Sequence, residues 1–463
     1  MKFRPFWYLL GFALVALIGY WLAGTAAPQK PVPAETAQTP AKPASKAPLD
    51  DSMPKFRRGN RLPATGRDLD AALAGAIVGE RVLVFKDQKA LAAFLERAGD
   101  RIRILGRLDA LNALRVGFSN YDDLLGLLDG DEEESFIFPV NVPDLPEGSV
   151  QPGAVALGSY LLQWLGISGD NSSAGKGVLV AILDTGVFAS SAFQTNIRSI
   201  NLVSLSGDPA AQNGHGTAVA SMIIGSDSLT PGVAPGASIL DIRIANDFGQ
   251  SDSFLLAQGI IAAVDGGAKL INISMGGFGD SAIMRNAIQY ALERGALIFA
   301  PTGNNGIDQV AYPAAYDGVI SIGAVDGYGN HLDFSNYGQG IDISAPGYGI
   351  NAAWTNNQSV SVTGTSFSTP IIAGAVAHLM TEAGSGNLTA NQAYNLLRAY
   401  LNDGGAAGEI RRIPVVQVML CREVPKNGVG FMDFDVTVQE RRYLVIGIDL
   451  QIGGRHVLAG RQI

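Results

Sequence analysis

The sequence predicts an α/β protein built on a doubly wound, mostly parallel sheet, with a small α+β domain before it and a short β extension after it. Three observations support this prediction. Beyond Gly175, short apolar runs alternate with helical stretches, which favours a parallel sheet covered by helices on both faces. Residues 63–146 show the order strand, helix, two strands, helix, strand. Residues 406–463 carry mainly β patterns.

The main part spans residues 147–405, and its apolar runs are predicted strands because each is short, continuous and bounded by turn residues. These strands lie at residues 178–183, 239–244, 270–273, 297–300 and 319–322. Helical spacing predicts helices at residues 218–224, 254–264, 283–294 and 391–401. In open sheets of this kind, functional side chains gather at the carboxyl ends of strands and the amino ends of helices.

The two flanking regions are predicted from shorter patterns. In the small domain, strands are expected at residues 81–85, 102–105, 113–118 and 136–138, and helices at 88–98 and 122–128. This order is that of a ferredoxin-like unit, which by itself specifies no function. In the extension, strands are expected at residues 414–419, 431–438, 443–450 and 456–458.

The N-terminus predicts export. Lys2 and Arg4 precede an apolar run at residues 6–23, and this basic flank directs everything downstream to the far side of a membrane. We favour a retained anchor for residues 1–24, because the run is long and has Trp and Tyr at both ends. A signal peptide cleaved near residues 24–26 is the alternative. Residues 25–62, rich in Pro, Ala, Lys and Thr, are a predicted spacer.

Composition excludes some classes of function. The chain has 463 residues and a formal net charge of -9, and it has no long basic stripe, so nucleic acid is not an expected partner. Cys421 is the only cysteine, which rules out an intrachain disulfide and a cysteine-based zinc site. We assign no metal, calcium or cofactor site.

Three motifs carry the chemistry. Asp184 follows a predicted strand, while His215 and Ser366 each open a predicted helix beside glycines. Together they supply the nucleophile, the base and the acid of nucleophilic acyl transfer. Taken singly, each has another explanation: a turn aspartate or half of an aspartic dyad completed by a dimer, a buried structural histidine, and a helix N-cap. The combination argues against these.

At these motifs the chain resembles the subtilisin-like serine proteases, in which the triad follows the order Asp, His, Ser. The resemblance covers about residues 155–400. It implies that Asp184, His215 and Ser366 form the triad and that His215 acts only when neutral. It also implies that Asn304 and the Ser366 N–H stabilise the oxyanion. An Asn-Gly turn is the other interpretation of Asn304.

The resemblance also implies where a substrate binds. An extended peptide is expected to lie between two stretches, with a side-chain pocket beside them; the residues are Phe248, Gly249, Gln250, Ser274, Met275, Gly276, Gly277, Thr302 and Gly303. Either stretch could instead be an ordinary loop. Three positions depart from the family. Ala311, often Gly, is expected to narrow that pocket, while Phe367, commonly Met, and Ile371, commonly His, are expected to affect only helix packing.

The functional prediction is an exported serine endopeptidase that cuts polypeptides, with the small domain as a prodomain that inhibits it until cleavage between residues 142 and 156. The catalytic part is expected outside the cytoplasm, tethered to the membrane by the N-terminal helix or secreted if that segment is removed. An envelope binding protein and an enzyme that cuts only its own prodomain are the alternatives.

Overall fold

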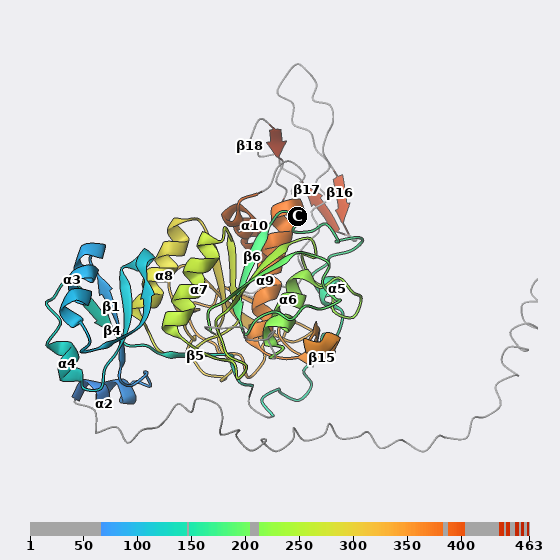
Figure 1. Cartoon of the computed structure of the whole chain (residues 1–463). Helices are drawn as coiled ribbons and strands as arrows, with labels where there is room; N and C mark the ends of the chain where they lie inside the picture. Colours follow the sequence, from blue (N-terminus) through green and yellow to red (C-terminus); the bar gives the residue numbers. More distant parts are fainter. Residues whose placement is uncertain are drawn as a thin grey trace, which may run out of the picture. The chain divides into compact units, whose positions relative to one another are not determined.

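The computed structural model describes residues 66–145, 148–203, 213–382 and 388–402, and five short strands between residues 435 and 462 (Figure 1). The predicted anchor at residues 1–24 and the spacer at 25–62 lie outside the described residues. Within the described ranges, no helix is both long enough and apolar enough to cross a membrane.

A seven-stranded sheet forms the main part, in the order β13-β12-β11-β10-β6-β8-β7, and every neighbouring pair is parallel. The predicted fold class is confirmed. The five predicted strands of this sheet are present, and β7 and β13 were not predicted. The strands are β6 (Leu179–Asp184), β7 (Ile197–Asn201), β8 (Ser238–Arg243), β10 (Leu270–Ile273), β11 (Leu297–Pro301), β12 (Val319–Val325) and β13 (Ile343–Pro346).

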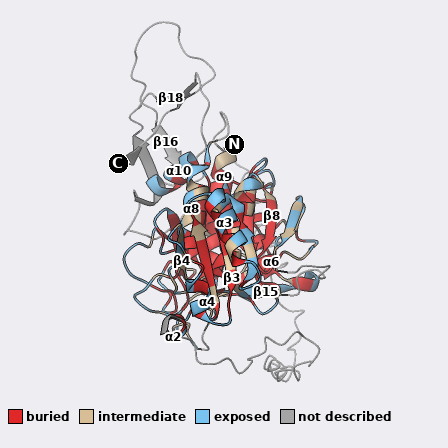
Figure 2. Ribbon diagram, turned by 60° about the vertical axis from the view of Figure 1, so that its left-hand side comes forward, coloured by how far each residue is buried: buried red, intermediate tan, exposed pale blue. Residues whose placement is uncertain are grey.

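Helices cover both faces of this sheet because successive strand residues point to opposite sides. In β6, Val180 and Ile182 pack in the core that includes α6 (His215–Ile224) and α9 (Thr365–Glu382). Ala181 and Leu183 pack in the core of α7 (Ser253–Asp265) and α8 (Ala282–Glu293). The central strands and α9 are accordingly buried (Figure 2).

Shorter elements surround this framework. Near the start of the main part lies α5, and α10 packs on α9. A hairpin lies before α9, and β9 lies just before α7. Their bounds are α5 (Leu161–Trp164), α10 (Ala390–Asn402), β9 (Gln250–Asp252), β14 (Ile350–Ala353), η2 (Thr355–Asn357) and β15 (Ser359–Val362).

The small domain has the expected ferredoxin-like strand order, β2-β3-β1-β4, with every pair antiparallel. A first helix, α2, was not predicted. The elements are α2 (Gly66–Leu73), β1 (Glu80–Phe85), α3 (Gln88–Ala98), β2 (Arg103–Leu108), η1 (Asp109–Leu111), β3 (Ala113–Gly117), α4 (Tyr121–Leu125) and β4 (Glu132–Ser135).

The last strand of the small domain was predicted wrongly. The apolar run at residues 136–138 is not a strand; β4, just before it, pairs with β1 instead. β4 lies at the edge of the sheet, where the exposed charge of Glu133 discourages pairing with other chains, while Glu134 accepts hydrogen bonds from Arg81 and Tyr121. Ile137 is buried against the α7 side of the main part, where burial rather than pairing explains its apolar character.

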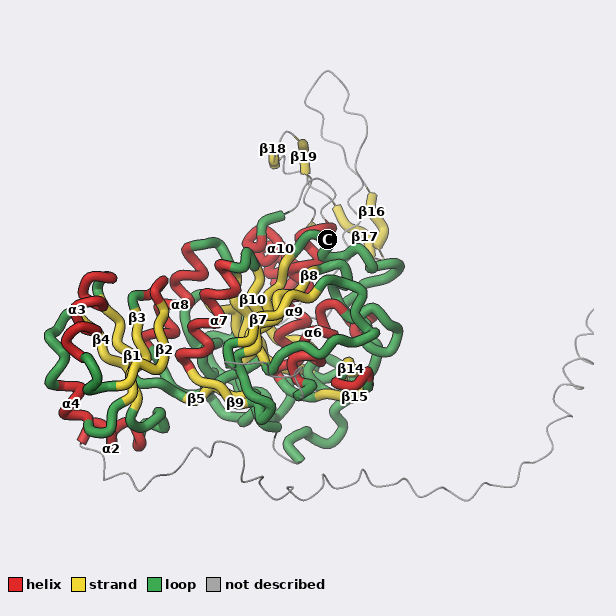
Figure 3. Tube along the Cα trace, in the orientation of Figure 1, coloured by secondary structure: helices red, strands yellow, loops and turns green. Residues whose placement is uncertain are grey.

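The small domain packs directly on α7. Gly106 of β2 faces the ring of Phe254, and a Cβ there would lie 2.6 Å from that ring. Arg115 Nη1 lies 2.7 Å from Asp252 Oδ2, while Asp252 Oδ1 caps α7. The chain then enters β5 (Pro139–Asn141), which pairs with β9 in an antiparallel manner (Figure 3).

Part of the extension is described as strands, as predicted. An antiparallel set joins β16 (Asp435–Val438), β17 (Arg441–Leu444) and β20 (Arg461–Gln462), and β18 (Leu450–Ile452) pairs with β19 (Arg455–Val457). The predicted strand at residues 414–419 lies outside the described residues.

Candidate active site

Asp184 and His215 form a buried pair at the carboxyl edge of the sheet. Asp184 ends β6, and His215 begins α6. His215 Nδ1 lies 2.8 Å from Asp184 Oδ1 and 3.0 Å from Oδ2. Because a carboxylate only accepts hydrogen bonds, Nδ1 must donate, which leaves Nε2 of the neutral ring free to take a proton. The main-chain N–H of Thr185 also donates to Asp184 Oδ1, at 2.7 Å, and holds the carboxylate in place.

Ser366 lies in the first turn of α9 and is only 2 % exposed. The next residue, Phe367, packs its ring 5.0 Å from the His215 ring. This contact corrects the expectation that Phe367 affects only helix packing. His215 Nε2 is buried and makes no hydrogen bond to any residue that the structure describes, so the pair His215–Ser366 is not joined by a hydrogen bond here. Such bonds often tighten only as the reaction proceeds.

The carbonyl of Ser366 has an unusual partner. In a regular helix it would accept the N–H of residue 370, but Pro370 has none. Instead Ser274 Oγ donates to it at 2.7 Å. Ser274 follows β10, so this bond ties the turn that carries Ser366 to the sheet edge. From the sequence, Ser274 was predicted only to bind substrate. Pro370, four residues after Ser366, was the signal that the Ser366 carbonyl needs a donor from outside the helix.

Asn304 is held with its amide nitrogen toward Ser366. Its Oδ1 accepts from the N–H of Thr365 at 2.9 Å and from Thr365 Oγ1 at 2.8 Å. A Cβ on Gly364 would lie 3.1 Å from Asn304 Nδ2 and 3.2 Å from Ser366 Oγ. The two groups therefore flank the same glycine, whose φ of +146° also disfavours a side chain. Thr365, which fixes the amide, was not identified from the sequence.

Two predicted substrate-binding segments lie close to the loop of Ala311 and Tyr312. Gly277 exchanges main-chain hydrogen bonds with Tyr312, and the Ala311 N–H donates to Thr302. Ala311 is buried, and its Cβ would lie 3.4 Å from a Cβ on Gly276 and 3.5 Å from one on Gly303. The methyl of Ala311 thus lies between Gly276 and Gly303, where the sequence predicted a side-chain pocket. Met275, which was predicted to bind substrate, is buried in the α7–α8 core.

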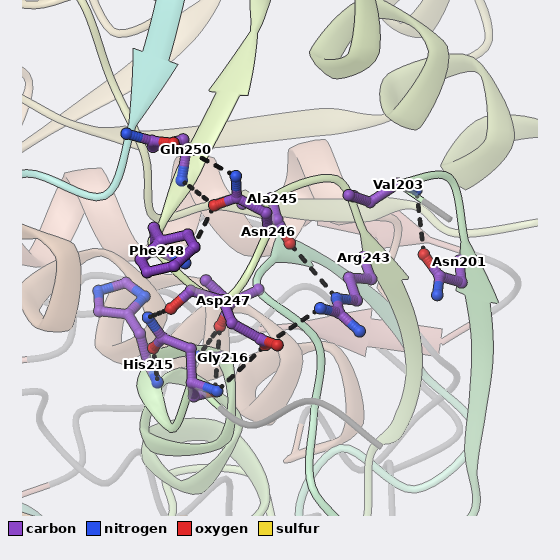
Figure 4. Close-up of polar contacts among 12 residues, drawn as sticks. Asn201, Val203, His215, Gly216, Arg243, Ala245, Asn246, Asp247, Phe248 and Gln250 are labelled. Carbon is purple, nitrogen blue, oxygen red and sulfur yellow. Dashed lines mark hydrogen bonds and ion pairs between the residues drawn. The ribbon is translucent and has the colours of Figure 1, made fainter. Parts of the chain in front are cut away.

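The other predicted stretch is a braced turn. Asn246 Oδ1 accepts the N–H groups of Phe248 and Gln250, each at 3.0 Å, and Arg243 Nη2 lies 3.0 Å from Asp247 Oδ1 (Figure 4). The Phe248 side chain is 77 % exposed. The Gly249 carbonyl accepts the main-chain N–H of Val142, which follows β5.

One further buried acid lies beside the pair. Asp241 of β8 is opposite Ile182 in the register with β6. Burial raises the pKa of its carboxyl to about 6; a hydrogen bond from Ser199 opposes this, and the charge of Asp184 adds to it. Its Oδ1 makes no hydrogen bond within the described part of the chain. In that same part, no three His, Cys, Asp or Glu side chains are grouped as metal ligands.

The sequence of this chain is similar to those of known proteins. The sequence model of the subtilase family matches residues 175–411, just over half of the chain. Subtilisin DY of Bacillus licheniformis is 34% identical over 48% of this chain and 83% of its own length. Subtilisin Savinase of Lederbergia lenta is 37% identical over 44% and 76%.

A solved structure supports the fold. Fervidolysin from Fervidobacterium pennivorans, a keratinolytic enzyme related to subtilisin, superposes with a TM-score of 0.58. The match covers 71% of this chain and 58% of that one, with 23% sequence identity. The chain belongs to the subtilase family and is a subtilisin-type serine protease.

Proposed function

We propose that this protease is an endopeptidase with Asp184, His215 and Ser366 as its triad, made as a proenzyme and exported. The pairing of His215 Nδ1 with the buried Asp184 carboxylate carries the proposal, because it leaves Nε2 as the proton acceptor of a ring that packs against Phe367, the residue after Ser366. The apolar run at residues 6–23 supports export, with the catalytic part outside the cytoplasm and anchored to the membrane.

In this mechanism Ser366 Oγ attacks a peptide carbonyl as His215 takes its proton. Asp184 keeps Nδ1 protonated and stabilises the imidazolium that forms. Asn304 Nδ2 and the Ser366 N–H donate to the oxyanion, and Thr365 keeps the Asn304 amide in the required orientation. His215 then protonates the leaving amine, and water hydrolyses the acyl-enzyme.

The substrate is proposed to bind as an added strand between Gly249 and Gly276, with one side chain entering the predicted pocket beside Ala311. The small domain, which begins at residue 66 of the described chain, is proposed to act as the prodomain. Its contact with α7 and the entry of β5 beside β9 support this role, because both put the small domain on the side of the molecule where a substrate would bind.

A fluorophosphonate probe tests the triad. The wild-type chain, once processed, is expected to be labelled, and Ser366→Ala is expected not to be. Asp184→Asn is expected to lower kcat on casein by about 10⁴-fold, because the imidazole loses the partner that fixes its tautomer. Labelling that persists in Ser366→Ala would contradict the assignment.

Two other functions are distinguished by the same samples. A binding protein on this fold would show neither labelling nor cleavage. A protease that processes only itself would be labelled and would cut its own chain but leave unfolded casein intact. Cleavage of casein that depends on Ser366 separates the endopeptidase from both.

A further inference from the structure

The segment that leaves the small domain runs as a strand through the candidate active site. β5 pairs with β9 on one side, with Val140 opposite Ser251 and Asn141 opposite Gln250. On its other side Asn141 exchanges two main-chain hydrogen bonds with Gly276, both at 2.9 Å. This segment therefore lies between the two stretches that are proposed to hold an extended substrate.

Its register is fixed residue by residue. The Val142 N–H donates to the Gly249 carbonyl at 2.8 Å. The main-chain carbonyl of the following residue, Pro143, accepts a hydrogen bond from Asn304 Nδ2 at 3.5 Å. Asn304 Nδ2 is the donor proposed to stabilise the oxyanion, so Pro143 has the position of the residue whose carbonyl is attacked.

We propose that the maturation bond is the peptide bond between Pro143 and Asp144, and that the proline delays its cleavage. The proposal rests on the proposed function and adds to it the bond that is cut and a residue that slows the cut. Both residues are accessible, since Asp144 is exposed and Pro143 is half-buried.

The chemical step is a complete acyl transfer. Ser366 Oγ forms a bond to the Pro143 carbonyl carbon, and its proton passes to His215 Nε2. The bond from that carbon to the Asp144 nitrogen breaks, and His215 gives the proton to this nitrogen, which becomes a new amino terminus. Water then hydrolyses the Pro143 ester and leaves a carboxylate.

The delay follows from the antiparallel register. Because Asn141 is opposite Gly276, residue 143 is opposite Ser274 two positions further on. Any other residue at position 143 could donate its main-chain N–H to the main-chain carbonyl of Ser274, but proline has no N–H. Pro143 is thus held by one main-chain hydrogen bond fewer than any other residue at this position would be. Losing one such bond corresponds to about a 3- to 10-fold slower cut.

The test is the self-cleavage of the full-length chain, synthesised in a cell-free system with lipid vesicles and followed by gel and by mass spectrometry. The wild type is expected to yield a fragment that begins at Asp144, and Ser366→Ala is expected to stay intact. Pro143→Ala is expected to cut at the same bond about 3- to 10-fold faster. Asp144→Ala, a matched change just after the bond, is expected to alter the rate far less.

Several outcomes would overturn the proposal. A new amino terminus elsewhere would mean that the register seen here is not the reactive one. A cut at Asp144 in the Ser366→Ala chain would assign the cleavage to another protease. A Pro143→Ala chain that is cut no faster than wild type would remove the delay. If casein is still cleaved in these cases, the proposed function stands while this inference fails.

Discussion

Ser274 Oγ donates a 2.7 Å hydrogen bond to the main-chain carbonyl of Ser366, and this bond replaces the helical one that Pro370 cannot make. Ser274 is therefore a positioning residue for the serine proposed as the nucleophile. It holds the first turn of α9 against the end of β10, where both elements are buried.

Replacing Ser274 is expected to slow catalysis more than it weakens binding. In Ser274→Ala the buried Ser366 carbonyl loses its donor, so the free energy of unfolding should fall by about 1–2 kcal/mol and kcat by roughly 10-fold. Pro370→Ala restores an N–H four residues after Ser366, so the double variant should recover part of both losses. Peptide kinetics measure the change in kcat, and chemical denaturation measures the change in the free energy of unfolding. If the effects of Ser274→Ala and Pro370→Ala simply add in the double variant, Ser274 does not replace the N–H that Pro370 lacks.

Asp241 is expected to make stability depend on pH. Its folded pKa of about 6 lies above the value of about 3.9 for an unfolded Asp, so the folded state binds the proton more tightly. The stability that this gives is present below about pH 4 and is lost as pH rises through 6. In Asp241→Asn this pH-dependent loss is absent, so the substitution should stabilise the fold by roughly 2 kcal/mol more at pH 8 than at pH 4.

Denaturation of the Ser366→Ala chain, with and without Asp241→Asn, measures this difference without self-digestion. Ser199, which hydrogen-bonds Asp241, is kept in both chains. An equal effect of the substitution at the two pH values would show that burial does not hold the proton on Asp241.

Arg115 is expected to keep the small domain docked. It forms ion pairs with Glu80 of its own sheet and with Asp252 of the main part, and its side chain is only 16% exposed. In the Ser366→Ala chain, Arg115→Gln should speed hydrogen exchange at the Asn141 and Val142 amides by about 10-fold, because Asp252 loses its cationic partner.

Arg107→Gln is the matched control for this prediction. Its ion pair with Asp109 is exposed on both sides, and exposed pairs contribute little. Exchange at the same two amides should stay near the wild-type rate. If both variants behave alike, the ion pair between Arg115 and Asp252 is not what holds this segment against β9 and Gly276.

Ala311 is expected to set the size of the side chain accepted before the cut. Ala311→Gly removes the methyl that lies between Gly276 and Gly303. The ratio of kcat/KM for peptides with Phe at this position to those with Ala should rise by about 5-fold or more. Ala314→Gly, also buried nearby in sequence, serves as a control that should leave the ratio unchanged.

Much of the fold followed from local pattern. The strand at Leu270–Ile273 and the helix at Gln88–Ala98 have the predicted bounds, because a buried apolar run and a regular amphipathic spacing leave few alternatives. β4 did not follow, since its acidic residues resemble no buried strand. Such a segment forms a strand only because the free edge of β1 lies beside it in the folded chain, and β1 is about 50 residues away in the sequence.

The sequence by itself determined which chemical groups the chain carries: an acid after a strand, a histidine and a serine at helix starts, and an amide beside a glycine. The tertiary structure decided how they are held, through Thr365 on Asn304, Ser274 on Ser366 and Phe367 against His215. It also decided that Pro143 faces Asn304. These contacts join segments far apart along the chain, and hydrogen bonds and packing between such segments depend on distances that only the folded backbone sets.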